Sequence, residues 1–495
     1  MDAFATAVTA VGLIIRLLDA YSSYSEEAKS LKIRFAWDFQ TLQDFNAYIV
    51  QRRAVQANQQ VDDQYAALLE QTAAYLNMFA RKIQKELHKL ERKGSLRDYL
   101  NRLEWATRRD YLKEVSRDMS QWATSLEVRL LSLKQELKEI PASSTGDQVR
   151  PPALVTSHSR LEELFALPSN AKQTRVKKML LEDSSDLASE ISGRDISTQP
   201  VQYKGDELIF ASRRVPPGKI QGTSEFLNMQ YQMGELAAAL NCLDPAADIR
   251  LLKVEYYFYH AESNQFLFVQ KSPYPLESMM TLEQVISATP FESTLDDRLK
   301  LANKIAEAVF FLHTAGFFHK NITSSSVVAL RRFRRPPHKP TEEEVPEFDD
   351  AYLMGFDLIR GTDAITTKEG AVRDSEEPIS PWDFDIFQHP DRLQGESSLE
   401  YNRAYDIYSL GVVLLEVGFW EPLRKIATDL EQTDQSGWVR KLLEIVPKLR
   451  LDVRIGKKYQ RLVTWCLNLK GGHIEDAEFI EEVLNPLEEI IHGLD

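Results

Sequence analysis

Cysteine is scarce in this chain of 495 residues, which contains only Cys242 and Cys466. A disulfide framework is therefore excluded, a reducing compartment is expected, and both thiols are predicted to be small core residues. With nine dispersed histidines, so few cysteines also argue against a structural zinc site, and we predict no bound metal. The Walker A, H-E-x-x-H, G-x-S-x-G and paired C-x-x-C signatures are absent too, so we predict no cofactor.

Long apolar runs are also missing. Residues 3–15 form an uncharged stretch of 13 residues, whereas a membrane-spanning helix needs about 20 mainly apolar residues. The N-terminus begins Met-Asp and lacks the basic region of a secretory signal. We therefore expect a protein that is soluble when made and cytoplasmic.

Positive charge is in short supply overall, with 60 Lys and Arg against 74 Asp and Glu and a net charge of −14. That balance, without a recognition motif, argues against nucleic acid as a partner. The distribution is uneven, because residues 1–140 hold 21 basic and 19 acidic residues and residues 81–117 hold 12 and 6. We interpret this basic stretch as a solvated helix face, with binding to anionic membrane lipids as the alternative.

The apolar pattern predicts an α + (α+β) fold in three parts. Helical spacing of apolar residues over 1–140, with short breaks, predicts an all-α helical bundle. Residues 141–194 are expected to hold a linker over 141–158, rich in Pro, Ser and Gly, and then a helical brace. Residues 195–495 begin strand-rich and become mainly helical after Leu282, which predicts a two-lobed α+β region.

Several short segments of the second half carry strand or helix patterns. The runs LIF at 208–210, KVEYYF at 253–258, FLFV at 266–269, VV at 327–328 and YL at 352–353 predict strands. Residues 225–240 predict a helix. The sequence RRFRRPP at 331–337 is interpreted as a mobile loop, with a phosphate or partner contact as the alternative.

The second half resembles a protein kinase domain. The clearest motif is DIYSLGVVLLE at 406–416, which is similar to the core helix of the large lobe in kinases. HPD at 389–391 stands in the place of the A-P-E element, and LHTAGFFHKNI at 312–322 resembles the passage from helix E into the catalytic loop. YLMGFD at 352–357 resembles strand 8 with D-F-G. Together these motifs cover about residues 195–490 and imply the two-lobed protein kinase-like fold.

The resemblance also indicates where kinase chemistry would be located. The catalytic-loop motif H-R-D-L-x-x-x-N reads HKNITSSS over 319–326, which puts Asn321 in the place of the base and Ser326 in that of the magnesium-binding Asn. D-F-G reads GFD, so Gly355 takes the place of the magnesium-binding Asp. The kinase-like residues that remain are His319, Phe356, Asp357 and Asp406.

Other kinase parts are replaced as well. No glycine-rich loop precedes the strands; Arg213 or Arg214 stands near the place of the lysine, and Glu235 is the candidate for the helix C glutamate. Asp406 is expected to hold the catalytic-loop backbone, and His319 to be a packed loop residue rather than a base. Because phosphoryl transfer depends on positioned charge and metal, we predict a pseudokinase without catalytic residues, and not an enzyme.

The first half resembles the HeLo domain of fungal incompatibility and cell-death proteins. The residues on which this resemblance rests are FATAVTAVGLII at 4–15 and the stretch 21–45, which includes LKIRF at 31–35. The resemblance covers about residues 1–190 and implies a bundle whose N-terminal segment is released to attack a membrane. The pairing of a bundle with a kinase-like region also resembles the mixed-lineage kinase-domain-like executioners of necroptosis. We find no prion-forming repeat motif.

These resemblances imply a regulated effector of programmed cell death or heterokaryon incompatibility. Its first helix would act on plasma-membrane lipids or self-associate on activation, controlled by the pseudokinase and an upstream regulatory protein. The predicted membrane or oligomerisation residues are Phe4, Val8, Val11, Leu13, Ile14, Ile15 and Leu18. Burial of this helix in the bundle core is an equally weighted alternative. A non-enzymatic protein-binding scaffold and an unconventional ATP-binding kinase that uses Asp357 are the other functions left open.

Overall fold

The structure is a computed structural model of the chain. It describes residues 15, 18, 29, 31–33, 35–36, 128, 131, 153–216, 219–245, 247–288, 293–332, 350–355, 360–361, 385–393, 401–430 and 437–494. The chain divides into two compact units, Met1–Ser159 and Arg160–Asp495. Most of the predicted bundle lies outside the described residues, so the account below concerns the second unit.

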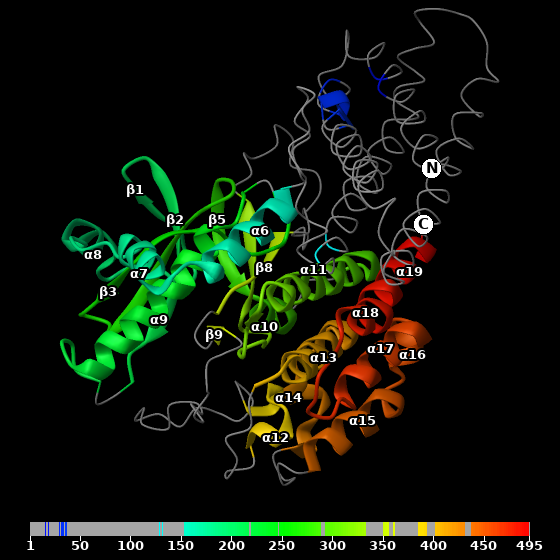
Figure 1. Ribbon diagram of the computed structural model, residues 1–495. Helices are drawn as coiled ribbons and strands as arrows, with labels where there is room; N and C mark the ends of the chain where they lie inside the picture. The colour runs from blue at the N-terminus through cyan, green and yellow to red at the C-terminus, as the bar shows by residue number, and fades with distance from the viewer. Residues whose placement is uncertain are drawn as a thin grey trace, which may run out of the picture. The chain divides into compact units, whose positions relative to one another are not determined.

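The first part of the second unit is an antiparallel sheet with one long helix, and we call it the small lobe (Figure 1). Its strands, in the order β1-β2-β4-β3, are β1 (Val201–Tyr203), β2 (Asp206–Arg214), β3 (Val254–His260) and β4 (Gln265–Lys271). Helix α9 (Ser224–Asn241) packs on one face, where the Tyr257 hydroxyl donates to the Gln230 carbonyl at 2.9 Å. The sequence predicted the last three strands and this helix, and the structure confirms them.

The segment that precedes the sheet packs against α9, against the β3 edge and against the other face of the sheet. This segment contains α6 (Ala153–Ala166), α7 (Ser169–Lys178) and α8 (Ser185–Ile191). The buried side chains of Leu187 and Ile191 in α8 pack in one cluster with Phe210 of β2. Between α7 and α8, the Leu181 amide donates to the Tyr257 carbonyl at 2.9 Å, which caps the exposed edge of β3. Of the helices predicted as a brace, α7 and α8 are therefore attached to the small lobe.

The second part, which we call the large lobe, is mainly helical. A three-stranded sheet in the order β5-β7-β8 consists of β5 (Leu276–Thr281), β7 (Val327–Arg332) and β8 (Ala351–Leu353). A second pairing joins β6 (Phe317–Phe318) to β9 (Arg360–Gly361). The helical elements are α10 (Leu282–Ser287), α11 (Leu295–Thr314), η2 (Asp385–Phe387), α12 (Pro390–Leu393), α13 (Arg403–Phe419), α14 (Leu423–Ile426), η3 (Thr428–Leu430), α15 (Trp438–Lys448), α16 (Leu451–Arg454), α17 (Lys457–Leu467), α18 (Asp476–Phe479), η5 (Ile480–Leu484) and α19 (Asn485–Leu494).

The core of the large lobe is built on α13, and every residue from Ala404 to Phe419 is buried. The helix begins after Asn402, whose side chain accepts a hydrogen bond from the Ala404 amide at 3.0 Å. It packs closely on α17 at Gly411, where an added Cβ would lie 2.6 Å from the Cys466 Cβ. Both Cys242 and Cys466 are free and buried, as predicted.

Two sequence predictions are wrong at their boundaries. The linker expected over 141–158 is helical from Ala153 onward, because α6 begins there. The loop expected from Arg331 is wrong at its first two residues, because Arg331 and Arg332 are the last residues of β7 and pair with β5. The Arg332 guanidinium also pairs with Asp350, with 2.7 Å between Nε and Oδ2. Backbone pairing and an ion pair thus order part of a basic run that resembles a solvated loop in sequence.

Candidate functional site

The loop between β6 and β7 is anchored by one buried carboxylate, that of Asp406 in the first turn of α13. Its Oδ2 accepts from the His319 amide at 2.7 Å, and its Oδ1 accepts from the Lys320 amide at 2.8 Å. The Tyr401 hydroxyl donates to Oδ1 at 2.7 Å, and His313 Nε2 lies 3.1 Å from Oδ2. Asp406 therefore holds the loop backbone in place, as the sequence suggested for this position.

The charge of Asp406 is kept although the residue is fully buried. Burial alone would raise the pKa of the carboxyl, but the hydrogen bonds from His313 and Tyr401 bring the pKa below its ordinary value. The helix N-terminus also favours a negative group at this place. Sequence reasoning missed Tyr401, which lies in none of the quoted motifs, and assigned no role to His313, which lies in the stretch 312–322; only their contacts with Asp406 identify them.

His319 is a structural residue of the same loop. Its Nε2 donates to the Met354 carbonyl at 2.9 Å, and its Nδ1 accepts from the Asn321 amide at 3.3 Å. Burial lowers the pKa of His319 to about 4, so the imidazole is neutral at pH 7. With both ring nitrogens engaged by backbone, the side chain links the 319–321 loop to the end of β8.

Asn321, Ser326 and Gly355, predicted from the sequence to occupy three catalytic places, lie next to one another. The Asn321 side-chain amide donates to the Gly355 carbonyl at 3.3 Å. The Ser326 hydroxyl donates to the Thr323 carbonyl at 2.8 Å and accepts from the Thr323 amide at 2.9 Å. An amide has no basic site for a proton, and a hydroxyl engaged with backbone is a weak magnesium ligand.

Gly355 has no room for a side chain. Its φ is +74°, a conformation that other residues adopt at a cost, and an added Cβ would lie 2.8 Å from the Ser326 Cβ. A carboxylate at position 355 would therefore require both the backbone and Ser326 to move. The neighbouring residues Phe356 and Asp357 lie outside the described residues.

On the small lobe, β1 and β2 are joined by the two-residue turn Lys204-Gly205, with φ of 50° and 89°. The chain then runs through β2 toward α9. Arg213 of β2 is buried, whereas its neighbours Ser212 and Arg214 are exposed. Of the two arginines proposed for the lysine place, Arg213 is thus the one on the inner face of the strand.

Glu235 does not reach this strand. Its carboxylate pairs with Lys172 of α7, with 2.9 Å between Oε1 and Nζ. Glu235 thus lies on the face of α9 that packs against α7, and its place as a helix C glutamate stays a prediction. At Gly234, an added Cβ would lie 2.5 Å from the Val176 Cγ1, which shows how closely the two helices approach.

Only two of the residues predicted for membrane or oligomer contacts are described. Ile15 and Leu18 are helical, with Ile15 half-buried and Leu18 fully buried. Phe4, Val8, Val11, Leu13 and Ile14 lie outside the described residues. Among the helices that the structure describes, none is both long and apolar enough to cross a membrane. In the same residues, no three His, Cys, Asp or Glu side chains gather as a metal site.

Comparison with known proteins gives a distant relationship to protein kinases. No family model matches the chain. A stretch of 139 residues is 27% identical to dual specificity testis-specific protein kinase 1 of Mus musculus, and equally to the Homo sapiens protein. This stretch is 28% of the present chain and 18% of each relative, so it spans less than a fifth of the relatives' length. With the lobed sheet-and-helix architecture, this supports a kinase-like region.

Proposed function

We propose that the kinase-like region does not transfer phosphate and instead controls the N-terminal helical region of a cell-death or incompatibility effector. The observation that carries the first half is the chemistry around Asn321, Ser326 and Gly355. Phosphoryl transfer needs a carboxylate to take the hydroxyl proton, and an Asn and an Asp to hold magnesium. The three residues have neither carboxylate nor space for one at Gly355, and they bond to the backbone and to one another.

The second half of the proposal concerns residues 1–140. The apolar residues Phe4 to Leu18 would pack in the bundle at rest and contact lipid or neighbouring copies after release, which is a two-state switch. The basic stretch 81–117 would attract anionic lipids, at about 1 kcal/mol for each Lys or Arg near the surface. An upstream regulatory protein would trigger release and recruit the cytoplasmic protein to the plasma membrane.

A phosphate-transfer assay tests the first half. Purified full-length protein is incubated with labelled ATP, magnesium or manganese, and a general acceptor protein. We expect no incorporation above a protein-free control. Metal-dependent incorporation that disappears in the Asp357→Asn variant would overturn the proposal and support an unconventional kinase. Incorporation that survives in this variant and in protein of higher purity would overturn it as well.

A vesicle-leakage assay tests the second half. Full-length protein and a form that lacks residues 1–20 are added to dye-filled vesicles, either neutral or containing anionic lipid. We expect leakage from the anionic vesicles with the full chain, and less with the shortened form, because the apolar segment is gone. Equal leakage from the two forms would remove the N-terminal helix from the mechanism. Tight partner binding without membrane recruitment in cells would favour a protein-binding scaffold.

A further inference from the structure

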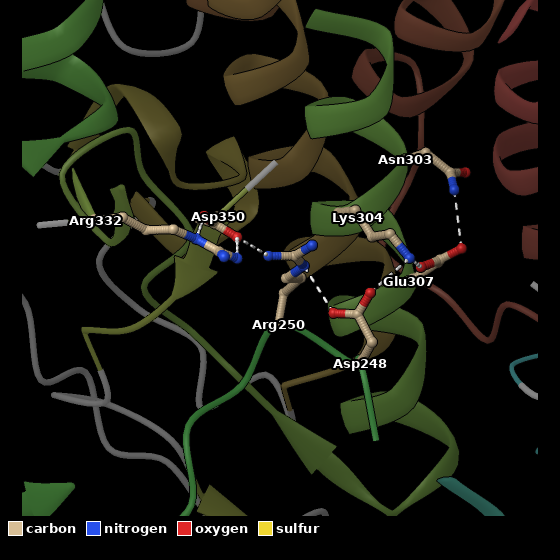
Figure 2. A network of polar contacts seen from close by, with 7 residues as sticks. All are labelled: Asp248, Arg250, Asn303, Lys304, Glu307, Arg332 and Asp350. Atoms are coloured by element: carbon tan, nitrogen blue, oxygen red, sulfur yellow. Dashed lines mark hydrogen bonds and ion pairs between the residues drawn. The ribbon is translucent and has the colours of Figure 1, made fainter. Parts of the chain in front are cut away.

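The two lobes of the second unit are joined by polar contacts besides their covalent connection. The first set, which we call the loop clasp, comprises Asp248, Arg250, Lys304, Arg332 and Asp350 (Figure 2). Asp248 and Arg250 belong to the small lobe, in the loop that follows α9, whereas Lys304 is on α11 and Arg332 and Asp350 flank the loop between β7 and β8. The loop clasp therefore fastens one lobe to the other.

Arg250 is the centre of the loop clasp. Its Nη1 lies 3.4 Å from Asp350 Oδ1 and its Nε lies 2.8 Å from Asp248 Oδ1, while its guanidinium stacks 5.4 Å from the centre of the Tyr352 ring. Its carbonyl accepts from the Leu353 amide at 2.8 Å, so its backbone also continues the pairing of β8. Only 11% of the Arg250 side chain and 9% of the Asp350 side chain are exposed. The ion pair of Arg250 and Asp350 is thus largely shielded from water.

The loop clasp extends into α11 through a chain of alternating charges. Asp248 Oδ2 lies 3.4 Å from Lys304 Nζ, which lies 3.1 Å from Oε2 of the buried Glu307. Glu307 Oε1 in turn accepts from the Asn303 side chain at 2.9 Å. Three cations and three carboxylates alternate along this chain (Figure 2). Removing Asp350 would leave the buried Arg250 with one carboxylate fewer beside it, which makes opening at this contact costly.

A second set of contacts, which we call the strand clasp, joins the lobes where the chain crosses between them. Glu207 of β2 accepts from the Ser272 amide through its carbonyl at 2.9 Å, and from the Leu276 amide through its Oε1 at 2.7 Å. The Thr198 carbonyl accepts from the Met279 amide of β5 at 2.8 Å. Glu207 and Thr198 belong to the small lobe, and Leu276 and Met279 to the large one.

The crossing segment, residues 272–275, also has little freedom to bend. It reads Ser-Pro-Tyr-Pro, so two of its four residues have φ fixed by the ring and the other two precede a proline. The Tyr274 hydroxyl donates to the Leu330 carbonyl at 3.1 Å, and the Arg332 guanidinium lies 4.1 Å from the centre of the Tyr274 ring. A hinge works through a few residues that absorb large changes of φ and ψ, and this segment is unsuited to that role.

We propose that the loop clasp, the strand clasp and the crossing segment hold the two lobes in one fixed arrangement, so that the kinase-like region moves as a single rigid body. Lobes that open and close around a ligand need a hinge and weak contacts between them. Here the hinge is proline-restricted, the loop clasp has the buried ion pair of Arg250 and Asp350 at its centre, and the strand clasp adds hydrogen bonds from backbone amides. The rigidity proposed here is independent of the proposal that the region does not transfer phosphate, since a kinase-like region can be inactive whether its lobes are rigid or mobile.

Distance measurements between two spin labels test the proposal in the full-length chain. Labels are attached to cysteines introduced by Ser212→Cys on β2 and Lys448→Cys on α15, both at exposed positions, while the native thiols are buried. We expect one narrow distance distribution, unchanged by magnesium and ATP. A broad or two-peaked distribution in the wild-type background would overturn the proposal.

Variants then show whether the clasps cause the rigidity. Asp350→Asn removes the carboxylate shared by Arg250 and Arg332, and combined with Glu207→Ala it should broaden the distribution. Pro273→Ala with Pro275→Ala changes only the crossing segment and should also broaden the distance distribution. This variant provides the measurement if the first one fails to fold. The matched control is Glu277→Gln, which removes an exposed ion pair to Arg331 on the same sheet and should leave the width unchanged. Distributions as narrow as the wild type in both clasp and crossing variants would refute the assignment.

Discussion

Replacing Asp406 by Asn tests how much the fold of the large lobe depends on one buried charge. The carboxylate accepts four hydrogen bonds, from two amides, His313 and Tyr401. Asn offers one accepting oxygen and turns an amino group toward the donors around the other oxygen, so about two of these bonds are lost. Hydrogen bonds to a charged group contribute about 1.5–3 kcal/mol each, so we expect the free energy of unfolding to fall by about 3–6 kcal/mol.

That loss is large against the total of about 5–15 kcal/mol that stabilises a typical domain. The assay is guanidinium unfolding of the full-length protein, followed by circular dichroism and tryptophan fluorescence, with Tyr401→Phe as the matched control. The control keeps the charge and removes one donor, so it should cost less than half as much as Asp406→Asn. A decrease below about 1 kcal/mol for Asp406→Asn would refute the reasoning, because hydrogen bonds to the charged group should not be so weak.

Three further changes have expected outcomes. Gly355→Asp should lower the free energy of unfolding by about 2 kcal/mol or more, because of the positive φ and the contact with Ser326, and should not produce phosphate transfer; a stable, active variant in the denaturation and ATP assays would contradict this. Gly234→Ala should cost about 1–3 kcal/mol, since its Cβ would overlap Val176, and an unchanged melting temperature would contradict that packing. Burial raises the pKa of Glu416 to about 7; stability is therefore full below the unfolded pKa near 4.5 and is lost as pH rises through 7, by up to about 3 kcal/mol. Glu416→Gln should remove this loss, so a melting temperature no higher than that of the wild type at pH 8 would contradict it.

The sequence was informative wherever the signal was local. Strands β2, β3 and β4 and helix α9 were predicted because short runs of the chain carry the apolar patterns of these elements, and α13 was expected from the resemblance of residues 406–416 to a kinase core helix. The order of the short motifs around His319, Gly355 and Asp406 likewise indicated that these residues would meet in one site, and Asp406 does hydrogen-bond to the His319 amide. The residue type at a motif position already states which functional group stands there, such as an amide at Asn321 and no side chain at Gly355.

Prediction from the sequence was incomplete where several partners for one side chain were possible. Glu235 is one of several acidic residues that could have stood opposite a basic residue of β2, and only the packing of α9 on α7 decides that it pairs with Lys172. The ordered end of the basic run at Arg332 was missed for the same reason, because Asp350 lies 18 residues further along the chain.

By itself, the sequence determined several strands and helices of the second part and the residue types at positions 321, 326 and 355, which carry no carboxylate. Tertiary structure alone decided that Gly355 has no room for a side chain, that Tyr401 and His313 support Asp406, and that two clasps join the lobes. The physical reason is separation along the chain. Arg250 and Asp350 are 100 residues apart, and no periodicity relates residues whose contact depends on how whole elements pack.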